Sequence, residues 1–415
     1  MTSAARNVLG VLERLEGPDV AVHQMRCIDV RNRNAGCTAC ADACTSGAIS
    51  LEEGLLSVRP ELCIGCGTCA TLCPTCALEA RHPTDEDLLA SCLAAMEASG
   101  GHSLLVLCSK NADGAFGRYD EAVCAVVGCL GRLDESLLAG LAARGCESVE
   151  LVVRGCEGCA HVSGLRTAEA VCASTSELLE AWGNPISIAL VDDIPAWARS
   201  TAPLGMVSER PAVAPDAQGF SAGDLCACDA EAVSEALEAA LLGAPSPEDP
   251  AAPVGEKAPE RSLPQKVGRD GTLAHHKPTR RGVLLQALGE LGEPAPVTVS
   301  TRLWGALSID TEACGSCRLC AVFCPTGALR KFDDRATATF GIDHAVADCV
   351  HCGCCEAICP KGAIHLANEV FAPDLVDGHV ERFEMRPQEI VSGKATTVVN
   401  KMRKLLVGSK AVNFA

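Results

Sequence analysis

The middle of the chain alternates continuous apolar runs with segments of helical periodicity. The apolar runs occupy residues 103–108, 122–127, 148–153 and 186–191. The helical segments occupy residues 85–98, 133–143 and 163–182, and Thr84 is the expected N-cap of the first. Apolar strands without polar alternation are typical of a parallel sheet that is buried on both faces. We therefore predict a central parallel α/β domain with a flavodoxin-like sheet over residues 84–195.

Shorter apolar clusters near both ends predict small antiparallel strands. Each cluster precedes closely spaced cysteines: Leu55, Leu56 and Val58; Leu307 and Ile309; Phe340 and Ile342. A short amphipathic helix, and no secretory signal, is expected at the start of the chain from the spacing of Val8, Val11, Leu12 and Leu15. No apolar run reaches about 18 residues, so we expect no membrane span.

Between residues 195 and 297 the periodicity is lost, and Ala, Pro, Glu and Gly dominate. We predict a linker over residues 196–298 that contains one helix at 230–242. Within it, Thr279-Arg280-Arg281-Gly282 reads as the basic start of a helix that contacts a partner. Residues 371–415 are expected to form a C-terminal tail that ends in a solvated, basic helix.

The chain has 28 cysteines, and four of them form a dense run. Cys63, Cys66 and Cys69 have C-x2-C-x2-C spacing, and Cys73-Pro74 follows. Three such cysteines can fold one loop around a cubane, while the fourth belongs to a second cluster. The run resembles the bacterial ferredoxin motif, and its ending recurs near both ends of the chain: Cys44, Cys73-Pro74, Cys324-Pro325 and Cys359-Pro360. The resemblance implies a two-cluster 4Fe–4S module in residues 1–83 and another in residues 299–370.

In these modules the last cysteine of each run is expected to ligate the other cluster. In the C-terminal module, the two predicted ligand sets are Cys314, Cys317, Cys320 and Cys359, and Cys349, Cys352, Cys355 and Cys324. In the N-terminal module, they are Cys27, Cys37, Cys40 and Cys73, and Cys63, Cys66, Cys69 and Cys44. Cys27 is a candidate replacement for the first ligand, because Asn34 holds the standard first position. Thr45, in place of the usual proline, is a second departure from the motif. The Cys27 cluster could therefore lack one iron or be missing.

A structural zinc protein is one alternative, because zinc also binds paired cysteines. Zinc explains neither the third evenly spaced cysteine nor the Cys-Pro pairs. Cluster spacing without an export signal favours a reducing cytoplasm over a disulfide scaffold. The net charge of −18 argues against nucleic acid as a partner.

Four further cysteines follow the strands of the middle domain: Cys108, Cys129, Cys156 and Cys159. Because the carboxyl ends of parallel strands share one edge of a sheet, we expect these thiols to meet there and to hold one 2Fe–2S cluster. The alternative is a core with buried cysteines, which behave as small apolar residues. That reading suits Cys92, Cys124, Cys146 and Cys172, although Cys124 could replace one of the four.

The Gly-Cys-x-x-Cys after a strand and the Cys-Leu-Gly-Arg-Leu-Asp turn at 129–134 resemble the iron–sulfur delta subunit of methyl-viologen-reducing hydrogenases. This resemblance covers about residues 103–182. It implies a 2Fe–2S centre that passes electrons from a hydrogenase or formate dehydrogenase toward a heterodisulfide reductase. Such domains are often fused to ferredoxin modules, as this chain would be.

We therefore expect an electron-transfer subunit of a cytoplasmic oxidoreductase complex, with four 4Fe–4S clusters and one 2Fe–2S cluster. The alternative is an iron–sulfur reductase whose middle domain binds substrate at an open iron or a dithiol. Cys76 and Cys354 are expected to be spare thiols, and Cys226 and Cys228 suit no complete site.

Overall fold

The computed structural model describes residues 19–200 and 265–386, apart from residues 33, 53, 116 and 269, together with the strand Val412–Phe414. Residues 17–204 and 261–415 belong to one compact unit, and every contact discussed below lies within it. The helix expected at the start of the chain, the helix at 230–242, Cys226, Cys228 and the basic end of the tail lie outside the described residues.

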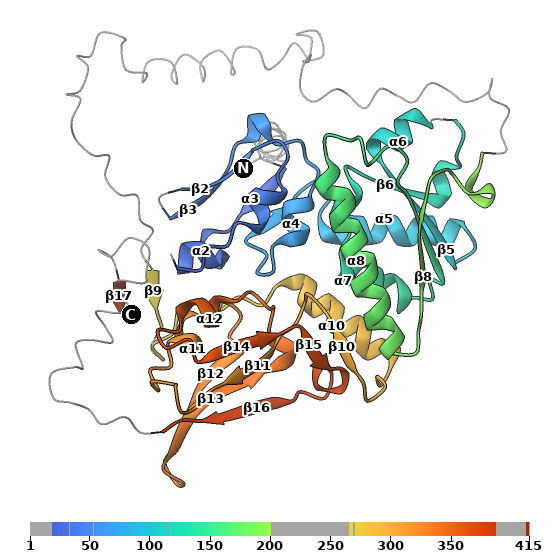
Figure 1. Ribbon diagram of the computed structural model, residues 1–415. Coiled ribbons are helices and arrows are strands. Elements are labelled where there is room, and N and C mark those ends of the chain that lie inside the picture. Colours follow the sequence, from blue (N-terminus) through green and yellow to red (C-terminus); the bar gives the residue numbers. More distant parts are fainter. Residues whose placement is uncertain are drawn as a thin grey trace, which may run out of the picture. The chain divides into compact units, whose positions relative to one another are not determined.

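The middle domain contains a four-stranded parallel sheet with the order β6-β5-β7-β8. Its strands are β5 (Ser103–Cys108), β6 (Cys124–Val127), β7 (Ser148–Val152) and β8 (Ser187–Val191). Its helices are α5 (Asp85–Ala98), α6 (Ser109–Gly114), α7 (Glu135–Ala142) and α8 (Val162–Ala181). In Figure 1 the long α8 helix lies beside the strands of this sheet. The predicted parallel sheet is confirmed, whereas the flavodoxin-like type stays a prediction because that fold has a fifth strand.

Alternating residues of β5 face the two sides of the sheet. Leu104 and Val106 pack with residues of α5, α7 and α8, whereas Leu105 and Leu107 pack with α6 and the segment around Ile194. Thr84 caps α5 as expected, because its hydroxyl accepts a hydrogen bond from the Asp87 N–H at 3.1 Å.

The N-terminal module is built from two antiparallel strand pairs and three short helices. β1 (Val20–Val22) pairs with β4 (Leu78–Ala80), and β2 (Ile49–Glu52) pairs with β3 (Leu55–Val58). The helices are α2 (Ile28–Arg31), α3 (Ala39–Ala43) and α4 (Thr68–Leu72). Several predicted ligands, including Cys27, Cys40 and Cys69, are part of its small buried core.

The C-terminal module repeats this plan with more strands. Its antiparallel pairs are β10 (Thr298–Ser300) with β15 (Glu369–Phe371), and β11 (Ala306–Ile309) with β14 (Ile364–Ala367). A three-stranded sheet contains β12 (Leu329–Asp334), β13 (Thr339–Ala345) and β16 (Val380–Glu384). The helices α11 (Leu319–Phe323) and α12 (Cys354–Ile358) carry cysteines, and β9 (Gln265–Val267) pairs with β17 (Val412–Phe414).

Two predicted boundaries need correction. The linker expected over residues 196–298 contains α10 (Thr279–Leu291), which packs on α7 and buries Leu284 and Leu288. The tail expected over residues 371–415 begins with structure that belongs to the C-terminal module, since β16 pairs with β13. The start of α10 agrees with the helix start expected at Thr279, but its packing on α7 and the pairing of β16 depend on distant parts of the chain, which local composition did not reveal.

His344 on β13 lets the stability of the C-terminal module be tested through pH. Its side chain is buried, and neither ring nitrogen has a hydrogen-bond partner among the described residues. Burial, with a smaller contribution from the charge of His379, lowers the pKa of His344 to about 4. The unfolded chain therefore binds the proton between about pH 6.5 and pH 4 while the folded chain does not.

We predict that this proton uptake lowers the free energy of unfolding by about 2 kcal/mol between pH 7 and pH 5. His344→Leu should flatten this part of the pH profile, whereas the exposed His365→Leu should leave its slope unchanged. Denaturant midpoints measured anaerobically across this range would check it. Equal slopes in the wild type and His344→Leu would contradict it.

Candidate metal centres

The first set of N-terminal cysteines comes from two different runs of the sequence. Cys27 precedes α2, Cys40 lies in α3, and Cys73 follows α4. Burial, with a smaller contribution from the nearby charge of Cys73, raises the pKa of Cys27 to about 11 and that of Cys40 to about 12. Burial also raises the pKa of Cys37, again with a contribution from Cys73. Cys27, Cys37 and Cys73 thus all lie near Cys40, the fourth member of their predicted set.

The second N-terminal set combines three cysteines of the later run with Cys44, the last cysteine of the earlier run. Burial raises the pKa of Cys69 to about 12, and the charges of Cys66, Cys63 and Cys44 are among the further causes. At Cys44 burial raises the pKa, but a hydrogen bond from the Ser46 hydroxyl and backbone N–H groups hold it below its usual value. Cys44 therefore lies with the later run, as Cys73 lies with the earlier one.

The C-terminal cysteines group in the same crossed manner. Burial raises the pKa of Cys320 to about 12, and charges from Cys317, Cys314 and Cys359 contribute. In the other group, burial raises the pKa of each thiol above its usual value, and the charge of Cys324 contributes every time: Cys349, Cys352 and Cys355.

The middle-domain cysteines meet at the carboxyl edge of the sheet. Cys108 ends β5, and Cys129 follows β6 by two residues. Burial, with smaller contributions from the charges of Cys108, Cys129 and Cys159, raises the pKa of Cys156 to about 11. Cys124 belongs to a separate apolar cluster on the other face, and the charges that act on it come from Asp120 and Glu121.

Hydrogen-bond donors surround the last cysteine of each run. The Ala77 N–H donates to Cys73 Sγ at 3.2 Å, and the Ala363 N–H donates to Cys359 Sγ at 3.3 Å. Three of these cysteines also have a hydroxyl two residues later: Ser46 at 3.5 Å from Cys44, Thr75 at 3.6 Å from Cys73, and Thr326 at 3.8 Å from Cys324. Hydrogen bonds to sulfur stabilise thiolate character and tune cluster potentials.

Each predicted set offers four thiols, which is the number and kind of ligand that a 2Fe–2S or 4Fe–4S cluster needs. Within the described ranges, no three His, Cys, Asp or Glu side chains converge on the position of a single metal ion. In a 4Fe–4S cluster each thiolate binds a different iron, so its ligands stand farther apart than the ligands of one ion. Because most of these thiols have raised pKa values, binding iron would displace their protons.

Cys76 occupies a backbone position that glycine holds in the other three copies of the motif. Its φ is 49°, compared with 65° at Gly47, 76° at Gly327 and 59° at Gly362. A non-glycine residue in this region costs about 1 kcal/mol or more, so another contact has to compensate. The Cys76 sulfur accepts hydrogen bonds from Arg280 Nη2 at 3.1 Å and Nε at 3.3 Å.

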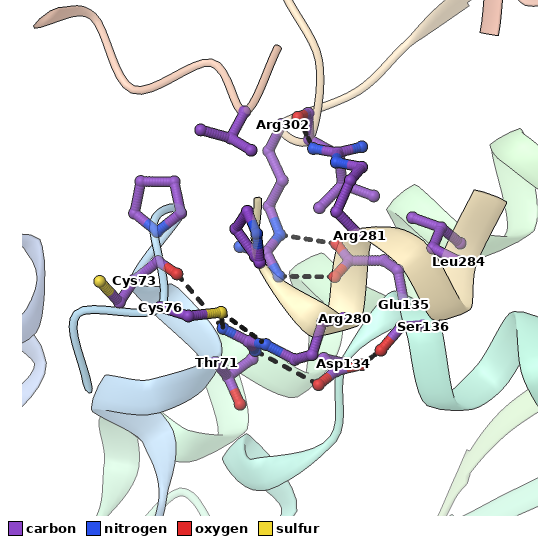
Figure 2. Close-up of a pocket in the computed structure, with 14 residues that line it drawn as sticks. Thr71, Cys73, Cys76, Asp134, Glu135, Ser136, Arg280, Arg281, Leu284 and Arg302 are labelled. Atoms are coloured by element: carbon purple, nitrogen blue, oxygen red, sulfur yellow. Dashed lines mark hydrogen bonds and ion pairs between the residues drawn. The ribbon is translucent and has the colours of Figure 1, made fainter. Parts of the chain in front are cut away.

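Arg280 connects the N-terminal module to the middle domain, as Figure 2 shows. It donates to the carbonyl oxygens of Ala70 at 2.6 Å and Cys73 at 3.2 Å, and to Asp134 Oδ2 at 3.3 Å. Burial raises the pKa of Asp134, but the Arg280 charge and a hydrogen bond from Ser136 outweigh it and hold that pKa below its usual range. Arg280 therefore stays paired with a carboxylate while it orients the chain beside Cys73.

A cavity of about 60 Å³ lies beside this contact and is lined by residues of all three parts, including Cys76, Glu135, Arg281 and Val350. Arg302 forms two hydrogen bonds of 2.7 Å with the Glu135 carboxylate. The Arg281 guanidinium lies 4.1 Å from the centre of the Trp304 ring.

Sequence reasoning missed the roles of two arginines. We expected the Arg280-Arg281 helix start to contact a partner, but its contacts in the structure are within the chain. No sequence motif pointed to Arg31, yet this residue is only 1% exposed and its guanidinium donates to the Cys324 carbonyl of the C-terminal module. The remaining cysteines that we assigned to cores are buried or half-buried: Cys92, Cys146 and Cys172. Cys354, which we expected to be a spare thiol, is buried as well.

Comparisons with known families agree with the ferredoxin motif. Residues 313–363 match the 4Fe-4S dicluster domain, and residues 56–79 match the 4Fe-4S binding domain. The chain carries two ferredoxin-type 4Fe–4S domains. Neither match covers the middle domain or Cys27, so the resemblance to the hydrogenase delta subunit stays a prediction.

Curated relatives match only short parts of the chain. Electron transport protein HydN of Escherichia coli K12 is 50% identical over 40 residues, which are 10% of this chain and 23% of HydN. A component of the ion-translocating oxidoreductase complex of Methanosarcina acetivorans is 39% identical over 67 residues, 16% of this chain and 23% of that component. The chain thus spans about a quarter of the length of these relatives. No solved structure matches it.

We predict that Arg280→Met lowers the free energy of unfolding by about 3 kcal/mol, because it removes the cation paired with buried Asp134 and the hydrogen bonds to the carbonyl oxygens of Ala70 and Cys73. The exposed Arg335→Met is the matched control and should change the denaturant midpoint little. The comparison should use anaerobic, iron-loaded protein. Equal midpoints for the two variants would show that the Arg280 contacts do not hold the parts together.

Proposed function

We propose that this protein is a multi-cluster electron-transfer subunit with four 4Fe–4S clusters and one 2Fe–2S cluster. The iron–sulfur character and electron transfer are supported by its two 4Fe–4S domains and by its relatives, HydN and the ion-translocating oxidoreductase component. One observation supports the count of five: in each of the five predicted sets, the charges of neighbouring thiols of the same set contribute to the raised pKa of a member. The proposed ligands are the sets predicted from the sequence.

The crossed grouping supports the assignment of two clusters to each module. Each run contributes its last cysteine to the group formed by the other run, as the ferredoxin motif implies. Cys27 supports a complete first set, because it is buried in the N-terminal core with Cys40. When bound, the clusters would accept and donate single electrons, while the protein's burial and N–H donors would set their potentials.

The middle-domain group supports the 2Fe–2S assignment. Its four thiols come from three strand ends, where ligands bind in parallel α/β sheets. The electron partners would be redox proteins of a hydrogenase, formate dehydrogenase or heterodisulfide-reductase type, in the cytoplasm. No helix among the described residues is long and apolar enough to cross a membrane.

A second candidate function is a reductase that acts at the middle domain. It is favoured by the partial exposure of Cys156 and Cys159, which lie in one Cys-x-x-Cys loop. The two functions differ in turnover: a reductase would convert a substrate without partner proteins.

The first prediction of this proposal concerns metal content and electron flow. Anaerobically reconstituted protein should contain about 18 irons per chain with similar sulfide. It should take electrons from dithionite and pass them to a dye, without steady turnover of a substrate by the chain alone. Stoichiometric zinc with little sulfide would refute the iron–sulfur assignment, and sustained substrate turnover would favour the reductase.

The second prediction tests the middle-domain group through Gly164 in α8. A Cβ added there would overlap the Cys129 sulfur, so Gly164→Ala should displace this thiol. The variant should lose about two irons and the 2Fe–2S spectrum while it keeps about 16 irons. In the control Gly158→Ala, the added Cβ meets nothing within 4 Å, and the iron content should be unchanged. A full iron complement in Gly164→Ala would contradict the assignment.

A further inference from the structure

The middle-domain group lies against one of the two N-terminal groups. A Cβ added at Gly128, next to Cys129, would lie 3.0 Å from the Gly65 carbonyl oxygen and 3.8 Å from the Cys66 Cα. Gly65 is in the loop between Cys63 and Cys66. The Ser163 hydroxyl, at the start of α8, also donates to the Ala43 carbonyl at 2.7 Å, one residue before Cys44. Both contacts therefore involve the Cys63, Cys66, Cys69 and Cys44 group.

The other N-terminal group lies against the C-terminal module. Arg31 ends α2, the helix that Cys27 precedes, and its Nη2 donates to the Cys324 carbonyl at 3.4 Å. Its Nη1 donates to the carbonyls of Met25 at 3.0 Å and Ala274 at 2.8 Å. Ile28 and Cys37 pack in the same apolar core as Cys324. This junction therefore joins the Cys27 group to the group that contains Cys324 and Cys349.

Within each module the two groups are neighbours because a short helix links a cysteine of one group to a cysteine of the other. Helix α3 carries Cys40 of one group and leads directly to Cys44 of the other, and α4 likewise carries Cys69 and leads to Cys73. In the C-terminal module α11 carries Cys320 and leads to Cys324. One helical turn thus separates neighbouring groups, which is also a short path for an electron.

We propose that the five centres form one unbranched chain in the order middle domain, Cys63 group, Cys27 group, Cys349 group, Cys314 group. This inference rests on the proposed function. Its two ends are the middle-domain centre and the Cys314 centre, and these are the points where electrons enter and leave. Exposed residues lie at both ends: Glu157 and Gly158 beside the first, and Glu312 and Ala313 beside the second. Redox partner proteins would approach these two loops.

Arg31 is a positioning residue in this arrangement. Burial lowers its pKa, while the charges of Cys354, Cys324 and Cys352 favour its charged form. Its guanidinium joins backbone on both sides of the junction, so it fixes the approach of the Cys27 and Cys349 groups.

The order can be tested by magnetic coupling between reduced centres in the full-length protein. A reduced 2Fe–2S centre relaxes faster when a paramagnetic neighbour is close. The double variant Cys63→Ser/Cys66→Ser, which removes its proposed neighbour, should slow the relaxation of the middle-domain signal several-fold. The matched variant Cys314→Ser/Cys317→Ser, which removes the far end, should leave that relaxation unchanged.

The junction of the modules needs a second pair of variants. In the Cys314→Ser/Cys317→Ser variant, the signal of the reduced Cys349 centre should still be split by its remaining neighbour, the Cys27 centre. Adding Cys37→Ser/Cys40→Ser should remove this splitting, whereas adding Cys63→Ser/Cys66→Ser should keep it. If the splitting is lost only when Cys63→Ser/Cys66→Ser is added, the proposed order is overturned.

A redox titration of the wild type gives the same answer without substitutions that could prevent folding. The relaxation of the middle-domain signal should change in one step, with the reduction of a single 4Fe–4S centre. No step, or two, would overturn the order. If the wild type contains about 18 irons but its magnetic couplings differ from those predicted, the proposed order of centres is refuted and the proposed function is not. A wild type that lacks clusters would refute the proposed function as well.

Discussion

One largely buried guanidinium, that of Arg280, lies where the N-terminal module, the middle domain and α10 meet. It pairs with Asp134, which caps α7, and it donates to the carbonyls of Ala70 and Cys73 and to the sulfur of Cys76. A charge that is 13% exposed needs such partners, because burial without them costs several kcal/mol. The same contacts hold the backbone beside Cys73, and so the geometry of the first cysteine group depends on them.

The second constraint is the crowding of thiols. Each group places four sulfur atoms in a largely apolar setting, and the pKa values of most of these thiols are raised by burial and by one another. Four thiolates in such a setting are unfavourable unless a positively charged centre compensates them. Iron supplies this compensation, so the folding of the small modules and the binding of clusters are coupled.

Patterns that depend on neighbouring residues could be predicted from the sequence. The apolar runs predicted all four parallel strands, and Thr84 predicted the start of α5. Cysteine spacing predicted that Cys27 belongs with Cys37, Cys40 and Cys73, and its burial near Cys40 and Cys73 is compatible with that prediction despite the nine-residue gap to Cys37. These successes share a cause, because spacing along a strand or loop determines which side chains can meet.

Contacts between distant segments could not be predicted in this way. The docking of α10 depends on the apolar surface of α7, and the burial of Arg31 depends on carbonyls some 240 and 290 residues away. β16 forms because β13 offers an open edge, although its own sequence reads as a tail. The sequence predicted Cys76 to be a spare thiol. Its sulfur accepts hydrogen bonds from Arg280, a contact that depends on how α10 packs and that spacing could not reveal.

The most direct test of five cysteine-bound centres is anomalous X-ray scattering at the iron edge from crystals grown without oxygen. The account predicts five separate iron peaks, one within each cysteine group, with the peak beside Cys129 weaker than the other four because it contains half the iron. Single peaks at the zinc edge within the groups, or no iron between Cys108, Cys129, Cys156 and Cys159, would contradict it.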